Sequence, residues 1–301
     1  MALLAWFLDP VDFGLFAAAM LILAAVEALS RMGLEDALIQ RRDDIEAYAD
    51  TGFALQFARG LILALAMILL AKPVGQFFDD PMVAAIVVAI AVVPILRGCT
   101  SIGLVLLQRS ISFKADSFNR LSVALISASV SVSLAAATAS VWSLVAGLII
   151  GELGGAIISY KLSRTSPRIG FEWARAKKLL SFGGWLLLAA VMSYISLQLD
   201  SIVVGRLFGL TALGSYYLAH RIASLTTLEL SKALSRVLKS AFAELQTDRE
   251  RARKALAQSL ACSLLAFLPI TIGVGLFGPV LLILVLGPEW EQAAAVQIGR
   301  A

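Results

Sequence analysis

Runs of apolar residues, separated by short polar segments, follow one another along the whole chain. The runs reach about 20 residues, the length of a helix that crosses a bilayer, and they lack the alternation of membrane-barrel strands. The pattern predicts helices at residues 13–30, 49–71, 82–107, 121–138, 142–160, 179–204, 212–235 and 255–277. We interpret residues 1–8 as the end of an earlier helix, and 278–286 as an apolar stretch before one that has barely begun. About nine to ten spans are therefore expected.

The polar stretch TASVWS at 138–143 separates two of these helices. A single helix from Leu121 to Tyr160 would be about 60 Å long, roughly twice the hydrocarbon thickness of a bilayer. We therefore expect a tight turn at 138–143, on the membrane face opposite the basic loops.

Composition makes this a membrane protein rather than a soluble one. Hydrophobic residues make up 59% of the 301 residues and charged residues 15%, whereas soluble domains hold about 25% charged residues. A soluble chain of this length has no core large enough to bury so much apolar surface. We predict an all-α integral membrane protein.

Basic residues predict the orientation of the chain. The net charge is +4, but the basic residues lie between spans, where membrane topology explains them, so we expect no nucleic-acid partner. One set of loops holds Arg31, Arg41, Arg42, Arg109, Lys114, Arg120, Lys161, Arg164, Arg168, Arg175, Lys177, Lys178, Arg236, Lys239, Arg249, Arg251, Arg253 and Lys254. The opposite loops hold Lys72 and Arg206. The basic loops are predicted to be cytoplasmic and to lie near lipid headgroups.

Short matches at a nearly constant offset indicate an internal repeat. The letters ALSR occur at 28–31 and again at 233–236. Two weaker matches in the same order are Phe13-Gly14 with Leu213-Gly214, and Asp80-Pro81 with Gly287-Pro288. We predict two parallel repeats of six helices each in the full-length protein. The predicted parts are an N-terminal bundle at 1–160 with a truncated first helix, a cytoplasmic linker at 161–178, and an incomplete C-terminal bundle at 179–301.

Several segments resemble one family of bacterial exporters. The similar stretches are LDPVDFGLF at 8–16, GLEDALIQR at 33–41, LQRSISFK at 107–114, LDSIVVGRLFGLTALGSYYLAHRI at 199–222 and LSRVLKSAFAELQ at 234–246. They resemble Wzx/WzxC-type lipopolysaccharide and polysaccharide flippases of the multidrug/oligosaccharidyl-lipid/polysaccharide exporter superfamily.

The resemblance implies both a function and a location. Such a protein moves polyprenyl-diphosphate-linked oligosaccharide from the cytoplasmic to the periplasmic leaflet of the bacterial inner membrane, by alternating access between two facing six-helix bundles. The implied partners are the lipid-linked oligosaccharide and membrane lipids, with a polysaccharide polymerase or glycosyltransferases as further candidates. Against this family, the chain is expected to be truncated at both ends.

Arginines within the spans are the first candidate site residues. An arginine at the centre of a membrane helix costs about 2.5–3.5 kcal/mol, so Arg59, Arg97 and Arg221 should face water, a partner or a ligand. Gln56 shares a helix face with Arg59, and Tyr217 shares one with Arg221. Guanidinium groups suit a diphosphate because their planar donors match its oxygens. The alternative is an ion pair that locks two helices.

Acidic residues within the spans are the candidates for ion coupling. Asp200 and Glu27 are the two candidates, although Asp200 also favours a pair with Arg206 near the interface, and Glu27 is the obvious partner for Arg59. Glu152 lies beside Gly147, Gly151 and Gly155, and we interpret it as part of a helix-packing face. Pro94 and Pro269 are candidate kinks.

Other classes of protein are weaker interpretations. A membrane polymerase or ligase would need a substantial periplasmic loop with paired acid and base groups, and the predicted loops are short, so we do not expect an enzyme. A drug or cation antiporter of the same superfamily would favour acidic groups at mid-depth. A chain that only recruits glycosyltransferases is a further alternative. Cys99, Cys262 and the single histidine, His220, have no metal-site spacing, so no metal or cofactor is expected.

Overall fold

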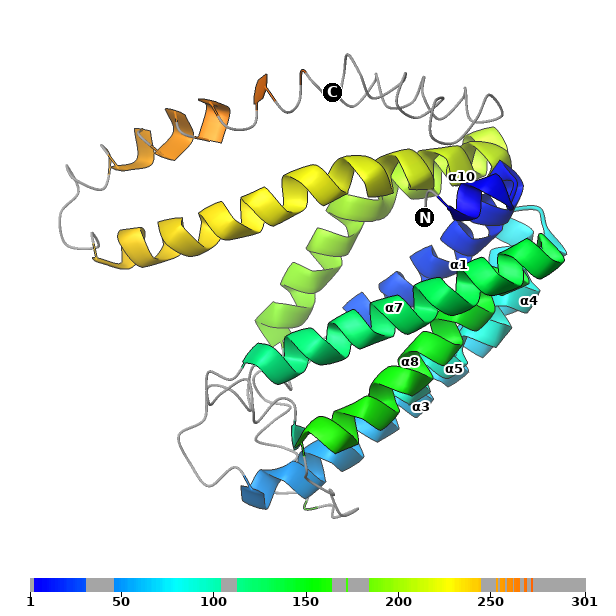
Figure 1. Cartoon of the computed structure of the whole chain (residues 1–301), viewed down its shortest axis with the longest axis horizontal. Coiled ribbons are helices and arrows are strands. Elements are labelled where there is room, and N and C mark those ends of the chain that lie inside the picture. The colour runs from blue at the N-terminus through cyan, green and yellow to red at the C-terminus, as the bar shows by residue number, and fades with distance from the viewer. Residues whose placement is uncertain are drawn as a thin grey trace. The chain divides into compact units, whose positions relative to one another are not determined.

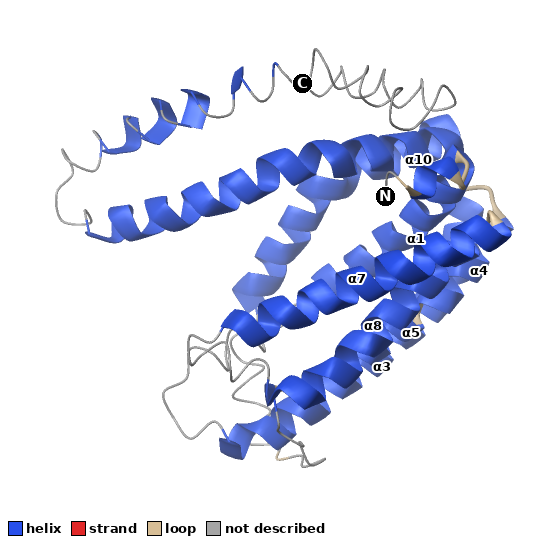
Figure 2. Ribbon diagram, in the orientation of Figure 1, coloured by secondary structure: helices blue, strands red, loops and turns tan. Residues whose placement is uncertain are grey.

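The described residues form helices joined by turns and loops, and no strand occurs among them (Figure 2). The computed structural model describes residues 3–30, 46–103, 113–163, 172 and 184–244, together with 253, 255–257, 259–261, 263–265, 268–269 and 272. The chain divides into two compact units, Leu3–Leu213 and Gly214–Ala301. Most of the predicted linker at 161–178 lies outside the described residues, so the predicted domain boundary stays a prediction.

Helix α1, Pro10–Leu29, begins at an Asp-Pro turn. Pro10 occupies the first helical position, where its missing N–H costs nothing. The Asp12 carboxylate accepts a hydrogen bond from Asp9 N at 3.4 Å and another from Val141 N at 3.2 Å, so the start of α1 is tied to a distant turn. The described part of the predicted helix end at 1–8 forms one 3₁₀ turn at Leu4–Trp6, and the earlier helix that it would end stays a prediction.

Helix α3, Glu46–Phe77, is longer than the sequence predicts. The prediction ends at residue 71, ahead of Pro73, but the helix continues through this proline. Prolines are tolerated inside membrane helices because neighbouring groups satisfy the freed backbone atoms. The turn that follows the helix includes Asp79, whose φ is +55°.

The predicted helix at 82–107 is instead two shorter helices, α4 at Pro81–Ile90 and α5 at Val92–Gly98. Pro94 has no N–H to donate to the carbonyl of Ile90, which explains the break between them. Because α5 ends at Gly98, Arg97 lies in the last turn of its helix.

Helices α7, Phe113–Thr138, and α8, Trp142–Ser163, form the predicted hairpin. The tight turn is confirmed, and Ala139 there has a φ of +43°. A Cβ at Gly147 would lie 1.9 Å from Ser131 Oγ and 2.7 Å from Ser127 O, so the two helices touch through this small residue. The predicted small-residue packing face is therefore confirmed.

Helix α10, Gly184–Glu244, is interrupted at Gly209, where φ is 82° and ψ is 178°. This break falls in the gap predicted between the helices at 179–204 and 212–235. Of the predicted helix at 255–277, the described residues support an apolar helix at Ala255–Leu265.

Six helices among the described residues are long and apolar enough to cross a membrane. Five lie side by side in the N-terminal unit, as α1, α3, α4 with α5, α7 and α8 (Figure 1). The sixth is Leu187–Arg221 of α10. The all-α membrane class is confirmed, whereas the pseudo-repeat and the nine to ten spans stay predictions.

Candidate functional site

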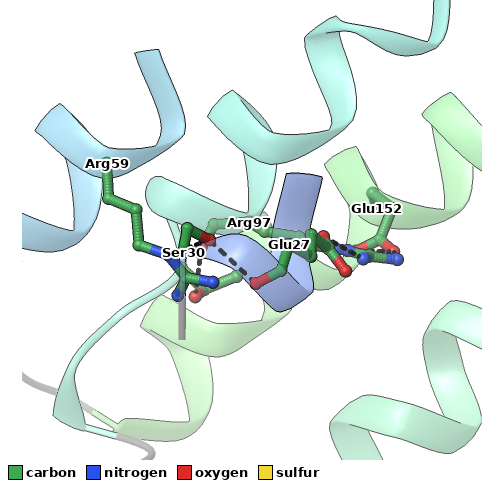
Figure 3. Close-up of polar contacts among 6 residues, drawn as sticks. Glu27, Ser30, Arg59, Arg97 and Glu152 are labelled. Carbon is green, nitrogen blue, oxygen red and sulfur yellow. Dashed lines mark hydrogen bonds and ion pairs between the residues drawn. The ribbon is translucent and has the colours of Figure 1, made fainter. Parts of the chain in front are cut away.

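Arg97 is the centre of a charged network inside the N-terminal bundle (Figure 3). From α5, its Nη1 lies 2.5 Å from Glu27 Oε1 on α1. Its Nη2 and Nε lie 2.5 and 2.8 Å from Glu152 Oε1 on α8. The side chain of Arg97 is 38% exposed, while Glu27 is 28% and Glu152 is 13% exposed. One guanidinium thus joins three helices and keeps part of its surface open.

Gln56 on α3 holds the backbone around Arg97. Its Nε2 donates to Arg97 O at 2.9 Å and to Thr100 Oγ1 at 2.9 Å. Thr100 in turn donates its hydroxyl to Arg97 O at 2.7 Å. Helices α3 and α5 approach closely here, because residue 60 is a glycine. A Cβ at Gly60 would lie only 2.5 Å from Pro94 O. The amide therefore fixes the turn that follows α5 against α3.

Arg59 lies next to the same network. Its Nε donates to Ser30 Oγ at 3.0 Å, and the Ser30 hydroxyl donates to Glu27 O at 2.9 Å (Figure 3). The carboxylate of Glu27 contacts Arg97, so Arg97 links α5 to α1, while the predicted pair between Arg59 and Glu27 stays a prediction. We call Glu27, Ser30, Gln56, Arg59, Arg97, Thr100 and Glu152 the Arg97 network.

The charges in the Arg97 network balance. Two guanidinium groups and two carboxylates share one polar region, which lowers the cost of placing each of them in the bundle. Such a network can bind an anion if the anion takes over part of the hydrogen bonding that a carboxylate supplies. It can equally hold three helices together, because each charge depends on the others.

Glu152 is the charged member of the network that the sequence interpretation missed. We assigned it to the packing face of α8 because glycines surround it. Its neighbours Gly151 and Gly155 are buried, as expected, while its own carboxylate reaches Arg97. The signal that pointed to it was the cost of an unpaired carboxylate in a span.

Tyr217 and Arg221 belong to the second compact unit. Tyr217 is half-buried and Arg221 is exposed. Their neighbour Tyr216 stacks on His220, with ring centres 6.4 Å apart. That Tyr217 and Arg221 share a cavity with Arg59 and Arg97 stays a prediction.

Asp200 lies in the first unit and accepts hydrogen bonds from Ser201 N at 2.6 Å and Ser201 Oγ at 3.3 Å. The partner that we predicted for it, Arg206, instead contacts the Asp79 carboxylate at 2.5 Å. The prediction of an Asp200–Arg206 pair is therefore wrong, because the turn after α3 supplies the carboxylate.

An apolar cavity of about 280 Å³ lies elsewhere in the first unit, between α1, α3 and α10. It is lined by Leu21, Ile22, Pro73, Val74, Phe77, Phe78, Tyr194 and Ile202. The Tyr194 hydroxyl donates to Leu21 O at 3.1 Å. The candidate site residues are not among its lining.

The described residues offer no group of three His, Cys, Asp or Glu side chains that could hold a metal ion. Cys99 is a free cysteine beside the Arg97 network, and burial raises the pKa of its thiol.

The six membrane-length helices among the described residues define a multi-pass helical membrane protein with a charged network inside its N-terminal unit. The chain belongs to the polysaccharide biosynthesis protein family, which matches residues 3–295. This confirms the family to which the sequence segments pointed.

Three relatives carry names from polysaccharide biosynthesis. The chain is 26% identical to the succinoglycan biosynthesis transport protein ExoT of Rhizobium meliloti, over 97% of this chain and 59% of ExoT. It is 25% identical to the lipopolysaccharide biosynthesis protein WzxC of Escherichia coli, over 98% of this chain and 61% of WzxC. It is 22% identical to the teichuronic acid biosynthesis protein TuaB of Bacillus subtilis, over 88% of this chain and 55% of TuaB. The chain thus spans about 60% of the length of the first two, and no solved structure matches it.

Proposed function

We propose that this protein moves polyprenyl-diphosphate-linked oligosaccharide from the cytoplasmic to the periplasmic leaflet of the bacterial inner membrane, for the synthesis of a surface polysaccharide. The family and the name of WzxC support a role in polysaccharide biosynthesis, and the name of ExoT supports transport within it. The six membrane-length helices supply the multi-pass body that a lipid transporter needs. The transport itself would proceed by alternating access.

The Arg97 network is the observation that carries the proposal. A diphosphate is a strong acceptor for planar guanidinium donors, and the 38% exposure of Arg97 leaves room for contact. In the proposed mechanism, the headgroup takes over the contact between Arg97 and Glu27, while Glu152 keeps Nε and Nη2 in place. Arg59 stands beside this position and adds a second positive charge. The charge of the substrate is thereby shielded within the bundle.

A complementation experiment tests the function. In a strain that lacks the native gene, we expect surface polysaccharide to be lost and lipid-linked oligosaccharide to accumulate. Expression of the full-length protein should restore the polysaccharide. The Arg59→Ala variant should restore less than a tenth as much, whereas Arg120→Ala should be normal, because Arg120 is 74% exposed and pairs with Asp116 in its own helix.

Other outcomes of this experiment would contradict the proposal. Normal polysaccharide in the deletion strain would exclude the transport role. A change in sensitivity to cationic drugs, with polysaccharide unaffected, would favour a drug or cation antiporter. Accumulation of fully flipped but unpolymerised oligosaccharide would favour a polymerase or ligase.

A further inference from the structure

Gly209 interrupts α10 with a backbone conformation that residues with a side chain rarely adopt. Its φ of 82° and ψ of 178° lie in a region that is essentially restricted to glycine. A Cβ at this position would meet no atom within 4 Å. Glycine is therefore needed here for its backbone freedom and not for close packing.

The turn before Gly209 is held by the α3–α4 turn. A Cβ at Gly205 would lie 2.7 Å from the Phe78 ring, so this ring packs directly on the α10 backbone. The Nη1 of Arg206 donates to Phe77 O at 2.7 Å and to Asp79 Oδ2 at 2.5 Å. Its guanidinium carbon also lies 5.4 Å from the centre of the Phe77 ring. Two successive residues of α10 are thus fixed by three successive residues of one turn.

The residue after Gly209 is held by α1. A Cβ at Gly14 would lie 1.9 Å from Leu210 O and 2.6 Å from Leu210 C, so the two backbones are in direct contact. Any side chain at position 14 would push α10 away. Gly209 is therefore a conformationally free residue between two anchored ones.

Asp79, which contacts Arg206, has a backbone conformation that costs free energy. Its φ of +55° is uncommon for a residue with a side chain. Its carboxylate is the group that Arg206 contacts. The turn thus places the Asp79 carboxylate next to Arg206, three residues before the break at Gly209.

We propose that Gly209 is the hinge about which the part of α10 that follows it changes direction, and that Gly205 and Arg206, just before it, form a fixed pivot. The Asp79–Arg206 contact is the latch that keeps the pivot seated. The proposal rests on the proposed alternating access for its purpose, but the hinge can be measured without any substrate.

Spin-label distances in the purified 301-residue chain test the hinge. Labels are attached to cysteines at the exposed positions Leu188 and Leu256, with Cys99→Ser and Cys262→Ser as the background. We expect a broad distance distribution for the parent protein. Gly209→Ala should shift at least one half of the population to a new and narrower distribution, because alanine disfavours the non-helical conformation by about tenfold or more. Phe208→Ala is the matched control, since Phe208 is 71% exposed and should leave the distances unchanged.

Two further variants remove the Asp79–Arg206 contact. They test the proposal even if the Gly209→Ala protein does not fold. Arg206→Ala and Asp79→Ala should each broaden the distribution, and the double variant should resemble Arg206→Ala alone, since both residues act through one contact. Distances that are unchanged in Gly209→Ala, or equally changed in Phe208→Ala, would overturn the hinge. Additive effects of Arg206→Ala and Asp79→Ala would overturn the latch. A working hinge in a chain that transports no glycan would contradict only the proposed function.

Discussion

Replacing Arg97 with alanine is expected to lower the amount of folded protein in the membrane several-fold, before any effect on transport. The substitution leaves the carboxylates of Glu27 and Glu152 without the guanidinium that neutralises them both. Removing one partner of a buried pair costs about 3–5 kcal/mol, and the partial exposure of Arg97 reduces this to about 1–3 kcal/mol. The measurement is the midpoint of thermal unfolding in detergent, together with membrane abundance.

The triple variant Glu27→Gln, Arg97→Gln, Glu152→Gln separates stability from function. Its three amides carry no charge and can still form hydrogen bonds, so abundance should return to near that of the parent. If Arg97 binds the substrate, transport should stay lost in this abundant variant. Full transport by the triple variant would assign Arg97 a purely structural role, and an Arg97→Ala protein as stable as the parent would contradict the network.

Replacing Gly147 with leucine is expected to reduce membrane abundance at least fivefold. The position faces α7, where even a Cβ would lie 1.9 Å from Ser131 Oγ and 2.7 Å from the backbone oxygen of Ser127. The backbone of α7 cannot retreat without losing the contacts along the rest of the hairpin. Quantitative immunoblotting of membrane fractions measures the loss.

Ala128 is the matched control, because it lies on an exposed face of α7. Ala128→Leu adds the same kind of side chain to the same hairpin and should keep abundance within twofold of the parent. Equal abundance of Gly147→Leu and Ala128→Leu would show that the α7–α8 contact does not depend on a small residue at 147.

The sequence predicts the helices well where a polar break interrupts an apolar run. The turn between α7 and α8 and the interruption at Gly209 were expected because polar or small residues mark them. The end of α3 was missed because Pro73 is a stop signal in water but not in a bundle. The break before α5 depends on Pro94, which the sequence indicated only as a kink.

The partners of the charged residues could not be predicted in the same way. The cost of charge in a span correctly singles out Arg59 and Arg97 as residues that need polar contacts. Which carboxylate meets which guanidinium depends on how the helices pack: Glu27 is 70 residues from Arg97 and Glu152 is 55. The choice of Asp79 over Asp200 for Arg206 has the same origin, because Asp79 belongs to a turn of another helix pair.

Transport of a lipid-linked glycan in membrane vesicles tests the central claim most directly. Inverted inner-membrane vesicles that contain the chain are given a fluorescent polyprenyl-diphosphate oligosaccharide in their outer leaflet, and a quencher that cannot cross the membrane reports how much becomes protected. We predict that the protected fraction rises with time, and that it does not rise in vesicles with Arg59→Ala at equal abundance. Protection equal to that of vesicles without the protein would contradict the account.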